Sequence, residues 1–263
     1  MLLFVFILGL VFGSFINVIV FRIPHKKNIL GRSKCLSCKR NIKWFDNIPL
    51  VSYLALRAKC RRCGARVSVQ YPLLEFSTAL IFSILYFLFI NCGTPPLSTS
   101  VICGFGGAWG FIYLMLLFVV LISIFVIDIK YQIIPDGLVY AGLGLVLVYV
   151  LLVNPKDIYS GIFAGFVASS FLLILNLATK GRGMGLGDVK FAIFGGMVAG
   201  LDNIFYWLSL SFFIGAVVGV FLIILNKAKL KSKIAFGPFL LLALVIIIIF
   251  GQVIKKYLDI NLI

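Results

Sequence analysis

Acidic residues are scarce in this sequence: its 263 residues include only eight Asp and Glu, against 24 Lys and Arg. Charged residues make up 12% of the chain, whereas 62% of the residues are hydrophobic, more than a soluble core could bury. The sequence also lacks internal repeats and low-complexity linkers. We therefore expect a membrane protein, in which the position of each carboxylate is informative because charge at a membrane helix is costly.

Long apolar runs divide the chain, most of them close to the roughly 20 residues that cross a bilayer. They cover residues 1–21, 72–90, 108–127, 137–153, 158–178, 189–201, 204–225 and 235–254. No basic residue precedes the first run and no small-x-small cleavage site precedes Arg22, so we interpret this run as a retained helix and not as a secretory signal. The sequence predicts an all-α, polytopic membrane bundle of about eight transmembrane helices.

The formal net charge of +16 would suit a nucleic-acid partner, but its distribution indicates topology instead. Residues 22–66 hold thirteen Lys and Arg against one acid, Asp46, whereas residues 91–108 hold no charge. Because cationic segments stay in the cytoplasm, we predict a multi-pass protein of the bacterial cytoplasmic (inner) membrane with both termini outside. We expect no nucleic-acid partner, and the basic loop is suited to contact anionic lipids of the bilayer.

Three parts follow from this topology. Residues 1–21 form a first transmembrane helix, residues 22–71 a cytoplasmic loop, and residues 72–263 a transmembrane bundle. Cys92 and Cys103 fall in an external segment of the bundle, where a disulfide and two free thiols are equally compatible with the sequence.

Four cysteines stand in the predicted cytoplasmic loop as two C-x-x-C pairs, Cys35/Cys38 and Cys60/Cys63, with 21 residues between them. Four thiolates can close a tetrahedral structural zinc site that leaves no open position for catalysis. Neighbouring cations favour the thiolate form of these cysteines. A loop with few core-forming residues needs a bound metal ion to stabilise its fold. Two disulfides and redox chemistry are the alternatives, and the cytoplasmic location disfavours the disulfides.

Half of the acidic residues lie in loops or in the tail and need no special explanation: Asp46, Asp157, Asp202 and Asp259. The others map to the cytoplasmic ends of predicted helices, where they could converge at one membrane level: Glu75, Asp128, Asp136 and Asp188. Asp188 follows a stretch with a glycine at every second position, which lacks the GxGxxG pattern of dinucleotide sites. Such glycines let a backbone lie extended against another peptide chain.

Asp128 and Asp188 are the candidate catalytic pair. Two carboxyls held close cannot both ionise cheaply, so one keeps its proton while the other activates water, as in aspartic proteases. The alternative is that each aspartate caps a helix or pairs with a base, Lys130 or Lys190. A transporter would need carboxylates in mid-helix and inverted repeats, and neither is visible. A zinc-dependent receptor or assembly platform would leave the contexts of the two aspartates unexplained.

Six motifs, spread in order over nearly the whole chain, resemble those of the type IV prepilin peptidase family. They are Gly13-Ser-Phe-Ile-Asn-Val18 with Arg22-Ile-Pro24, the two C-x-x-C pairs, Tyr71-Pro-Leu-Leu-Glu75, Ile127-Asp-Ile-Lys130 with Ile134-Pro-Asp136, Gly185-Leu-Gly-Asp-Val-Lys190, and Phe236-Gly-Pro-Phe239. The fifth is similar to the GxGD motif that presenilin-like intramembrane proteases share.

The resemblance implies an enzyme that cuts the short basic leader from type IV prepilins or pseudopilins after a glycine, at the cytoplasmic membrane face. It also implies N-methylation of the new N-terminus with S-adenosylmethionine. It assigns catalysis to Asp128 and Asp188, and it makes these residues supporting ones: Glu75, Asp136, Lys190, Gly185 and Gly187. The family places methyl transfer in the first loop and residues 13–24. No residue here is assigned to S-adenosylmethionine, because nothing resembles a soluble methyltransferase fold.

Overall fold

A computed structural model describes residues 1–91, 107–153, 155–181, 184–225 and 235–260, and a helix is present for every predicted apolar run. The long helices are α1 (Leu2–Arg22), α3 (Gln70–Ile90), α5 (Gly107–Tyr131), α6 (Asp136–Val153), α7 (Ile158–Ala178), α8 (Leu186–Ala199), α9 (Leu201–Ile224) and α10 (Gly237–Ile260). The shorter elements are the helix α2 (Val51–Ala55) and the 3-10 helices η1 (Trp44–Asn47) and η4 (Pro155–Asp157). The described residues contain no strand, so the all-α class is confirmed. Cys92 and Cys103 lie outside the described residues.

Six helices are long and apolar enough to cross a membrane: α1, α3, α5, α6, α7 with η4, and α9. The other two expected spans, α8 and α10, are not among these six. α8 has 14 residues, which rise about 21 Å, less than the roughly 30 Å of a hydrocarbon core. In α10, a helix of 24 residues, the described side chains give an apolar stretch of Gly237–Gly251. The polytopic helical bundle is confirmed, and within the described residues six helices are long and apolar enough for a full crossing.

The chain divides into two compact units, residues 1–90 and residues 91–263. The first unit contains α1, the cysteine-bearing loop and α3. The second contains the helices from α5 to α10. The helix α3, which opens the predicted bundle of residues 72–263, thus lies in the same compact unit as α1.

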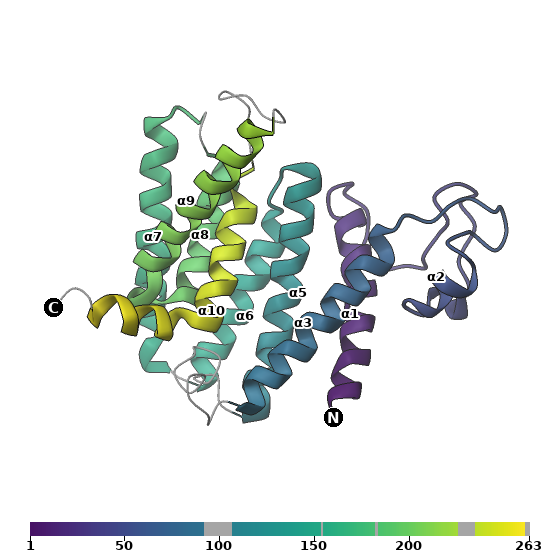
Figure 1. The fold of residues 1–263 in the computed structure, drawn as a ribbon, viewed down its shortest axis with the longest axis horizontal. Helices are drawn as coiled ribbons and strands as arrows, with labels where there is room; N and C mark the ends of the chain where they lie inside the picture. The colour runs from purple at the N-terminus through teal and green to yellow at the C-terminus, as the bar shows by residue number, and fades with distance from the viewer. Residues whose placement is uncertain (92–106, 154, 182–183, 226–234, 261–263) are drawn as a thin grey trace. The chain divides into compact units, whose positions relative to one another are not determined.

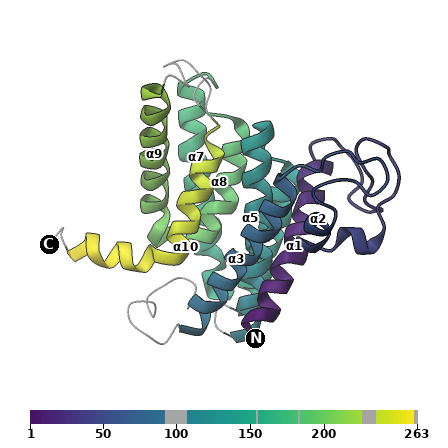
Figure 2. The ribbon, with the colours of Figure 1, turned by 45° about the vertical axis from the view of Figure 1, so that its right-hand side comes forward.

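In the first unit, α1 and α3 run side by side (Figures 1 and 2). Gly9 and Gly13 lie one turn apart on α1 and bring its backbone against α3. A Cβ on Gly13 would lie 2.6 Å from the Cα of Glu75, and a Cβ on Gly9 would overlap the backbone of Ala79. Small residues spaced by four allow membrane helices to approach this closely.

In the second unit, α8 is the most enclosed helix, and its buried face packs against α7. A Cβ on Gly196 would lie 2.8 Å from the carbonyl oxygen of Ala164. On the other side, Trp207 of α9 packs against Gly195, and its indole N–H donates to the carbonyl of Leu240 in α10 at 2.9 Å. Glycines on α8 thus let two neighbouring helices close around it.

The close contact of Gly13 with α3 can be tested by substitution. Because the Cβ of a Gly13→Ala variant would meet backbone and not a flexible side chain, we expect it to lower the free energy of unfolding by about 1–3 kcal/mol. The measurement is thermal unfolding of the purified protein in detergent. The control is Gly144→Ala in α6, where a Cβ meets nothing within 4 Å, so that greater helix propensity is the only expected effect. Equal stability of the two variants would contradict the close packing of α1 on α3.

Candidate active site and cysteine cluster

Asp128 lies in the last turn of α5 and is 4% exposed. The helix ends just beyond it, where Gln132 has a left-handed φ of 55° and donates its N–H to the carbonyl of Asp128 at 2.8 Å. The carboxyl oxygen Oδ2 of Asp128 is buried and has no hydrogen-bond partner among the described residues. An unpartnered buried acceptor costs about 1–3 kcal/mol and is rare in folded proteins, so its retention points to a function.

Asp188 lies in the first turn of α8 and is 7% exposed. Its carboxylate accepts the N–H of Gly185 at 3.1 Å, and its own N–H donates to the carbonyl of Gly185 at 3.2 Å. Gly185 is extended, but α8 begins directly after it. The expectation that an extended glycine stretch reaches Gly187 is therefore wrong. The preceding segment is held to α7 because the amide of Asn176 donates to the carbonyl of Met184 at 2.6 Å.

Asp128 and Asp188 are neighbours, close enough for their carboxylates to repel each other. The side chain of Ile134 links their surroundings. A Cβ on Gly187 would lie 3.2 Å from the Cβ of Ile134, and a Cβ on Gly237 would lie 3.2 Å from its Cδ1. The same added atom on Gly237 would overlap the Asp128 carboxyl. The two aspartates, the isoleucine and the two glycines thus form one contiguous group at the ends of α5, α8 and α10.

Asp136 and Lys190 form an ion pair of 2.8 Å beside this group. Asp136 begins α6 and Lys190 lies in α8, so the pair joins the two helices. Both side chains are about half exposed, so water screens the pair and its contribution to stability is small. Lys190 therefore neutralises Asp136 and not Asp188, which was one of the alternatives for the buried aspartate.

The four cysteines of the loop form one cluster in which all four Sγ atoms lie within 4.8 Å of one another. The Sγ atoms of Cys35 and Cys63 are 3.8 Å apart, which is about the edge of a tetrahedron with metal–sulfur bonds of roughly 2.3 Å. The expected ligand set is thus brought together. Because all four corners are cysteines, the arrangement is typical of a closed structural metal site.

The two C-x-x-C pairs fold into the same turn. The N–H of Lys39 donates to the carbonyl of Cys35 at 3.0 Å, and the N–H of Gly64 donates to the carbonyl of Cys60 at 2.9 Å. Lys39 and Gly64 both have a left-handed backbone, with φ of 60° and 68°. The repeated turn directs two pairs of thiols toward one point.

The thiols differ in pKa. Backbone N–H groups donate to Cys35, Cys38 and Cys60 and lower the pKa of each. At Cys63 the N–H of Ala65 acts in the same direction, but desolvation and hydrogen bonds with the other thiols outweigh it and raise the pKa to about 11. A metal that binds all four thiolates would have to displace this remaining proton.

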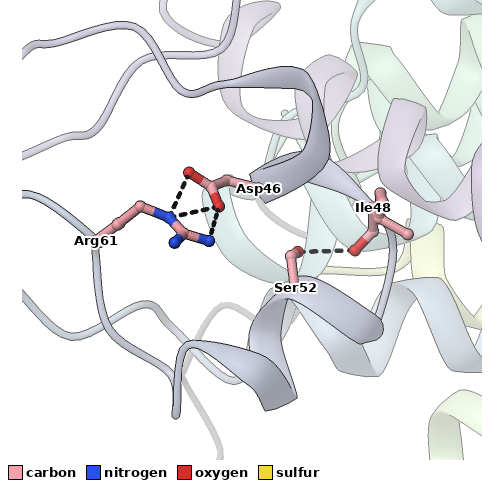
Figure 3. Close-up of polar contacts among 4 residues, drawn as sticks. All are labelled: Asp46, Ile48, Ser52 and Arg61. Atoms are coloured by element: carbon pink, nitrogen blue, oxygen red, sulfur yellow. Dashed lines mark hydrogen bonds and ion pairs between the residues drawn. The ribbon is translucent and has the colours of Figure 1, made fainter.

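Arg61 holds the second cysteine turn to η1 (Figure 3). Its Nη2 donates to Oδ1 of Asp46 at 2.7 Å and its Nε donates to Oδ2 at 3.1 Å, in the two-pronged arrangement that makes Arg–carboxylate pairs strong. The side chain of Asp46 is only 9% exposed. Asp46, which needed no explanation in the sequence, therefore helps to fix the cysteine loop.

A cavity of about 840 Å³ lies within the first unit, lined by α1, α3 and the cysteine loop. Eleven Lys and Arg line it, but only two carboxylates, Asp46 and Glu75. Glu75 is 7% exposed and accepts the N–H of Leu50 at 2.8 Å. The supporting residue Glu75 thus belongs to this cavity, whereas Asp136, Lys190, Gly185 and Gly187 belong to the second unit.

Three further residues shape these sites and were not predicted as site residues from the sequence: Asn17, Arg22 and Gly237. The guanidinium of Arg22 donates to the carbonyls of Asn28, Ile29, Gly31 and Arg32, at 2.7 to 3.2 Å, and so organises the chain where it leaves α1. All three residues stand inside motifs that carried the family resemblance. The available signals were a lone amide within an apolar run and a glycine directly before Pro238.

Comparison with known proteins covers both units. Residues 7–89 match the family model of the bacterial peptidase A24 N-terminal domain, and residues 115–220 match that of the type IV leader peptidase family. The chain is 31% identical to the prepilin leader peptidase/N-methyltransferase of Stutzerimonas stutzeri, over 96% of this chain and 92% of that protein. Proteins of the same name from Pseudomonas aeruginosa (32% identical, 96% and 92% covered) and Vibrio cholerae (31%, 92% and 93%) are similarly close. No solved structure gives a significant match. The chain belongs to the type IV leader peptidase family.

Proposed function

We propose that this protein removes the leader peptide of type IV prepilins or pseudopilins with Asp128 and Asp188 as an aspartate dyad, and then N-methylates the new N-terminus. The observation that carries the peptidase proposal is the pair of buried, neighbouring carboxylates, one of which has an oxygen without a partner. Family membership and the names of the relatives support the substrate class and the second activity.

The positions of the two aspartates on their helices favour different roles in catalysis, one as the base and one as the acid. Asp188 lies at the N-terminus of α8, where the helix dipole and the N–H of Gly185 stabilise a negative charge. Asp128 lies at the C-terminus of α5, where the helix dipole disfavours a negative charge. Asp188 is thus suited to take a proton from the attacking water, while Asp128 donates its proton to the scissile carbonyl oxygen.

The supporting residues keep this group in place. Gly187 leaves room for Ile134 beside α8, and the ion pair of Asp136 with Lys190 joins α6 to α8. The substrate must unwind locally, because a helical peptide bond is shielded by its own backbone hydrogen bonds. The extended, exposed Gly185 is a suitable contact for that unwound chain.

The charge distribution supports a location in the bacterial inner membrane, with the aspartates at the cytoplasmic face and both termini outside. In this orientation the basic leader of the substrate lies in the cytoplasm and its apolar mature segment lies in the bilayer. The cysteine loop would then be on the same side as the cut.

The proposed function implies two bound groups besides the substrate, a structural zinc ion and the methyl donor S-adenosylmethionine. The spacing of the four thiols fits structural zinc, held by Cys35, Cys38, Cys60 and Cys63. The cavity of the first unit falls within the roughly 300–1,000 Å³ of small-molecule sites, and its cations suit the carboxylate of S-adenosylmethionine. That donor supplies a methyl group activated by a sulfonium.

The dyad is tested by Asp128→Asn and Asp188→Asn. Because each variant loses a group that moves a proton, we expect cleavage to fall at least about 100-fold. The measurement is mass spectrometry of a co-expressed prepilin in membranes. Asp157→Asn, which changes an acid on η4, serves as the control and should cleave normally. Cleavage at the wild-type rate by either dyad variant would rule out the proposed mechanism.

The position of Gly237 next to Asp128 leads to a separate prediction about cleavage. A Gly237→Ala variant places a Cβ where the Asp128 carboxyl lies, so the carboxyl must move. We expect a loss of cleavage of about 100-fold, since small displacements of a reacting group have effects of this size. The initial rate is compared with that of Gly219→Ala on α9, where a Cβ meets nothing within 4 Å. Equal rates for the two variants would show that Asp128 is not held as proposed.

The zinc assignment predicts one zinc ion per chain, measured by elemental analysis of the purified protein. We expect Cys60→Ser to lose the metal and to make the loop sensitive to limited proteolysis, because metal binding contributes to folding. Ser37→Ala, a change between two of the cysteines, should retain both properties. Full zinc content in Cys60→Ser would exclude the four-cysteine site.

A further inference from the structure

Asn17 lines the cavity of the first unit and is 4% exposed. Its Nδ2 donates to the carbonyls of Gly13 at 3.3 Å and Tyr71 at 3.1 Å. Both partners are acceptors, so the amide orientation is fixed, with its nitrogen toward the two carbonyls. Its Oδ1 is buried, and no residue in the described part of the chain forms a hydrogen bond with it. A residue of the cavity lining therefore carries an oriented acceptor that no described residue uses.

Glu75 is the second acceptor in this wall. Its carboxylate receives the N–H of Leu50 at 2.8 Å and a hydrogen bond from Ser14, and both of these donors are neutral. The other carboxylate that lines the cavity, Asp46, is already held by Arg61. Neither ion pair found among the described residues includes Glu75, so its negative charge has no cationic partner there.

These two acceptors lie on the facing helices α1 and α3. Asn17 follows Gly13 by one turn, and Gly13 packs on the backbone of Glu75. A ligand group that satisfies both must supply several N–H donors and a positive charge but no acceptor, which describes an ammonium group. We propose that Asn17 and Glu75 bind the α-amino group of the cleaved pilin, the methyl acceptor.

The proposal rests on the proposed function, and the depth of the two residues favours the substrate over the methyl donor. Asn17 and Glu75 each lie five positions inside the loop-side end of their helix, at Arg22 and Gln70. This places them about 7.5 Å along the helix from that end. A processed pilin begins with its apolar membrane segment, so its amino group would lie near this level. A water-soluble donor would enter from the loop side.

Methyl transfer at Asn17 and Glu75 is a balanced reaction when S-adenosylmethionine is the methyl donor. The ammonium must first lose one proton, which the Glu75 carboxylate accepts. The freed lone pair then forms the bond from nitrogen to the methyl carbon, while the carbon–sulfur bond breaks and its electrons remain on sulfur. The product is a secondary ammonium at the pilin N-terminus and a neutral thioether. Asn17 positions the nitrogen and takes no proton.

The test is equilibrium binding of two synthetic peptides to the full-length protein in detergent. Both carry the first residues of a processed pilin, one with a free N-terminal amine and one with an acetylated N-terminus. We expect the wild type to prefer the free amine by about tenfold, the size of a charge-assisted hydrogen bond. The preference should disappear in Asn17→Leu and in Glu75→Gln, whose amide still accepts the N–H of Leu50.

Asn203→Leu is the matched control. It removes another buried asparagine with an unpartnered Oδ1, on α9 of the second unit, and should keep the preference. The proposal is overturned if the wild type binds both peptides equally, or if Asn17→Leu and Glu75→Gln keep the preference. It is also overturned if these variants lose binding of S-adenosylmethionine alone. A wild type that prefers the free amine but transfers no methyl group would instead refute the proposed methyl transfer.

Discussion

Glycine makes room for the buried carboxyls of this protein. At Gly237 the space of a Cβ is taken by the carboxyl of Asp128, and at Gly13 it is taken by the backbone that carries Glu75. Between helices in lipid the hydrophobic effect supplies little attraction, so association depends on close packing and on polar contacts. Two of the close approaches in this protein, at Gly237 and at Gly13, occur at residues that bear charge. The same glycines therefore hold the helices together and position the acidic groups.

The short α8 shows a second effect of the membrane environment. A helix of 14 residues cannot present both ends to water across a full bilayer. The backbone N–H groups at the start of a helix have no acceptor within the helix and must find one elsewhere. Asp188 provides one by accepting the N–H of Gly185, and Asn176 fixes the preceding segment through Met184. The helix end that needs an acceptor thus also orients the proposed base.

The apolar runs and the cysteine spacing predicted most of the fold, because transmembrane length and C-x-x-C turns are local properties of the chain. The pairing of side chains could not be predicted in this way. Asp188 is two residues from Lys190, yet the lysine bonds Asp136, because α6 lies on that side of α8. Gly237 is more than a hundred positions from Asp128, and only the packing of α10 on α5 brings them together. The glycine pattern before Asp188 was misjudged, because Gly187 serves packing against Ile134 within a helix and not an extended chain.

Cleavage must precede methylation, and the two hydrogen-bond acceptors Asn17 and Glu75 can by themselves ensure this order. Before cleavage, the nitrogen of the scissile bond is an amide with one N–H, no charge and a lone pair delocalised into the carbonyl. Such a group cannot satisfy both Asn17 and Glu75, nor compensate the charge of Glu75. Cleavage converts it into an ammonium with three donors and a positive charge, which fits the pair. Selection of the methyl acceptor therefore requires no recognition of the pilin sequence at this position, because the hydrolysis creates the only feature that the site has to bind.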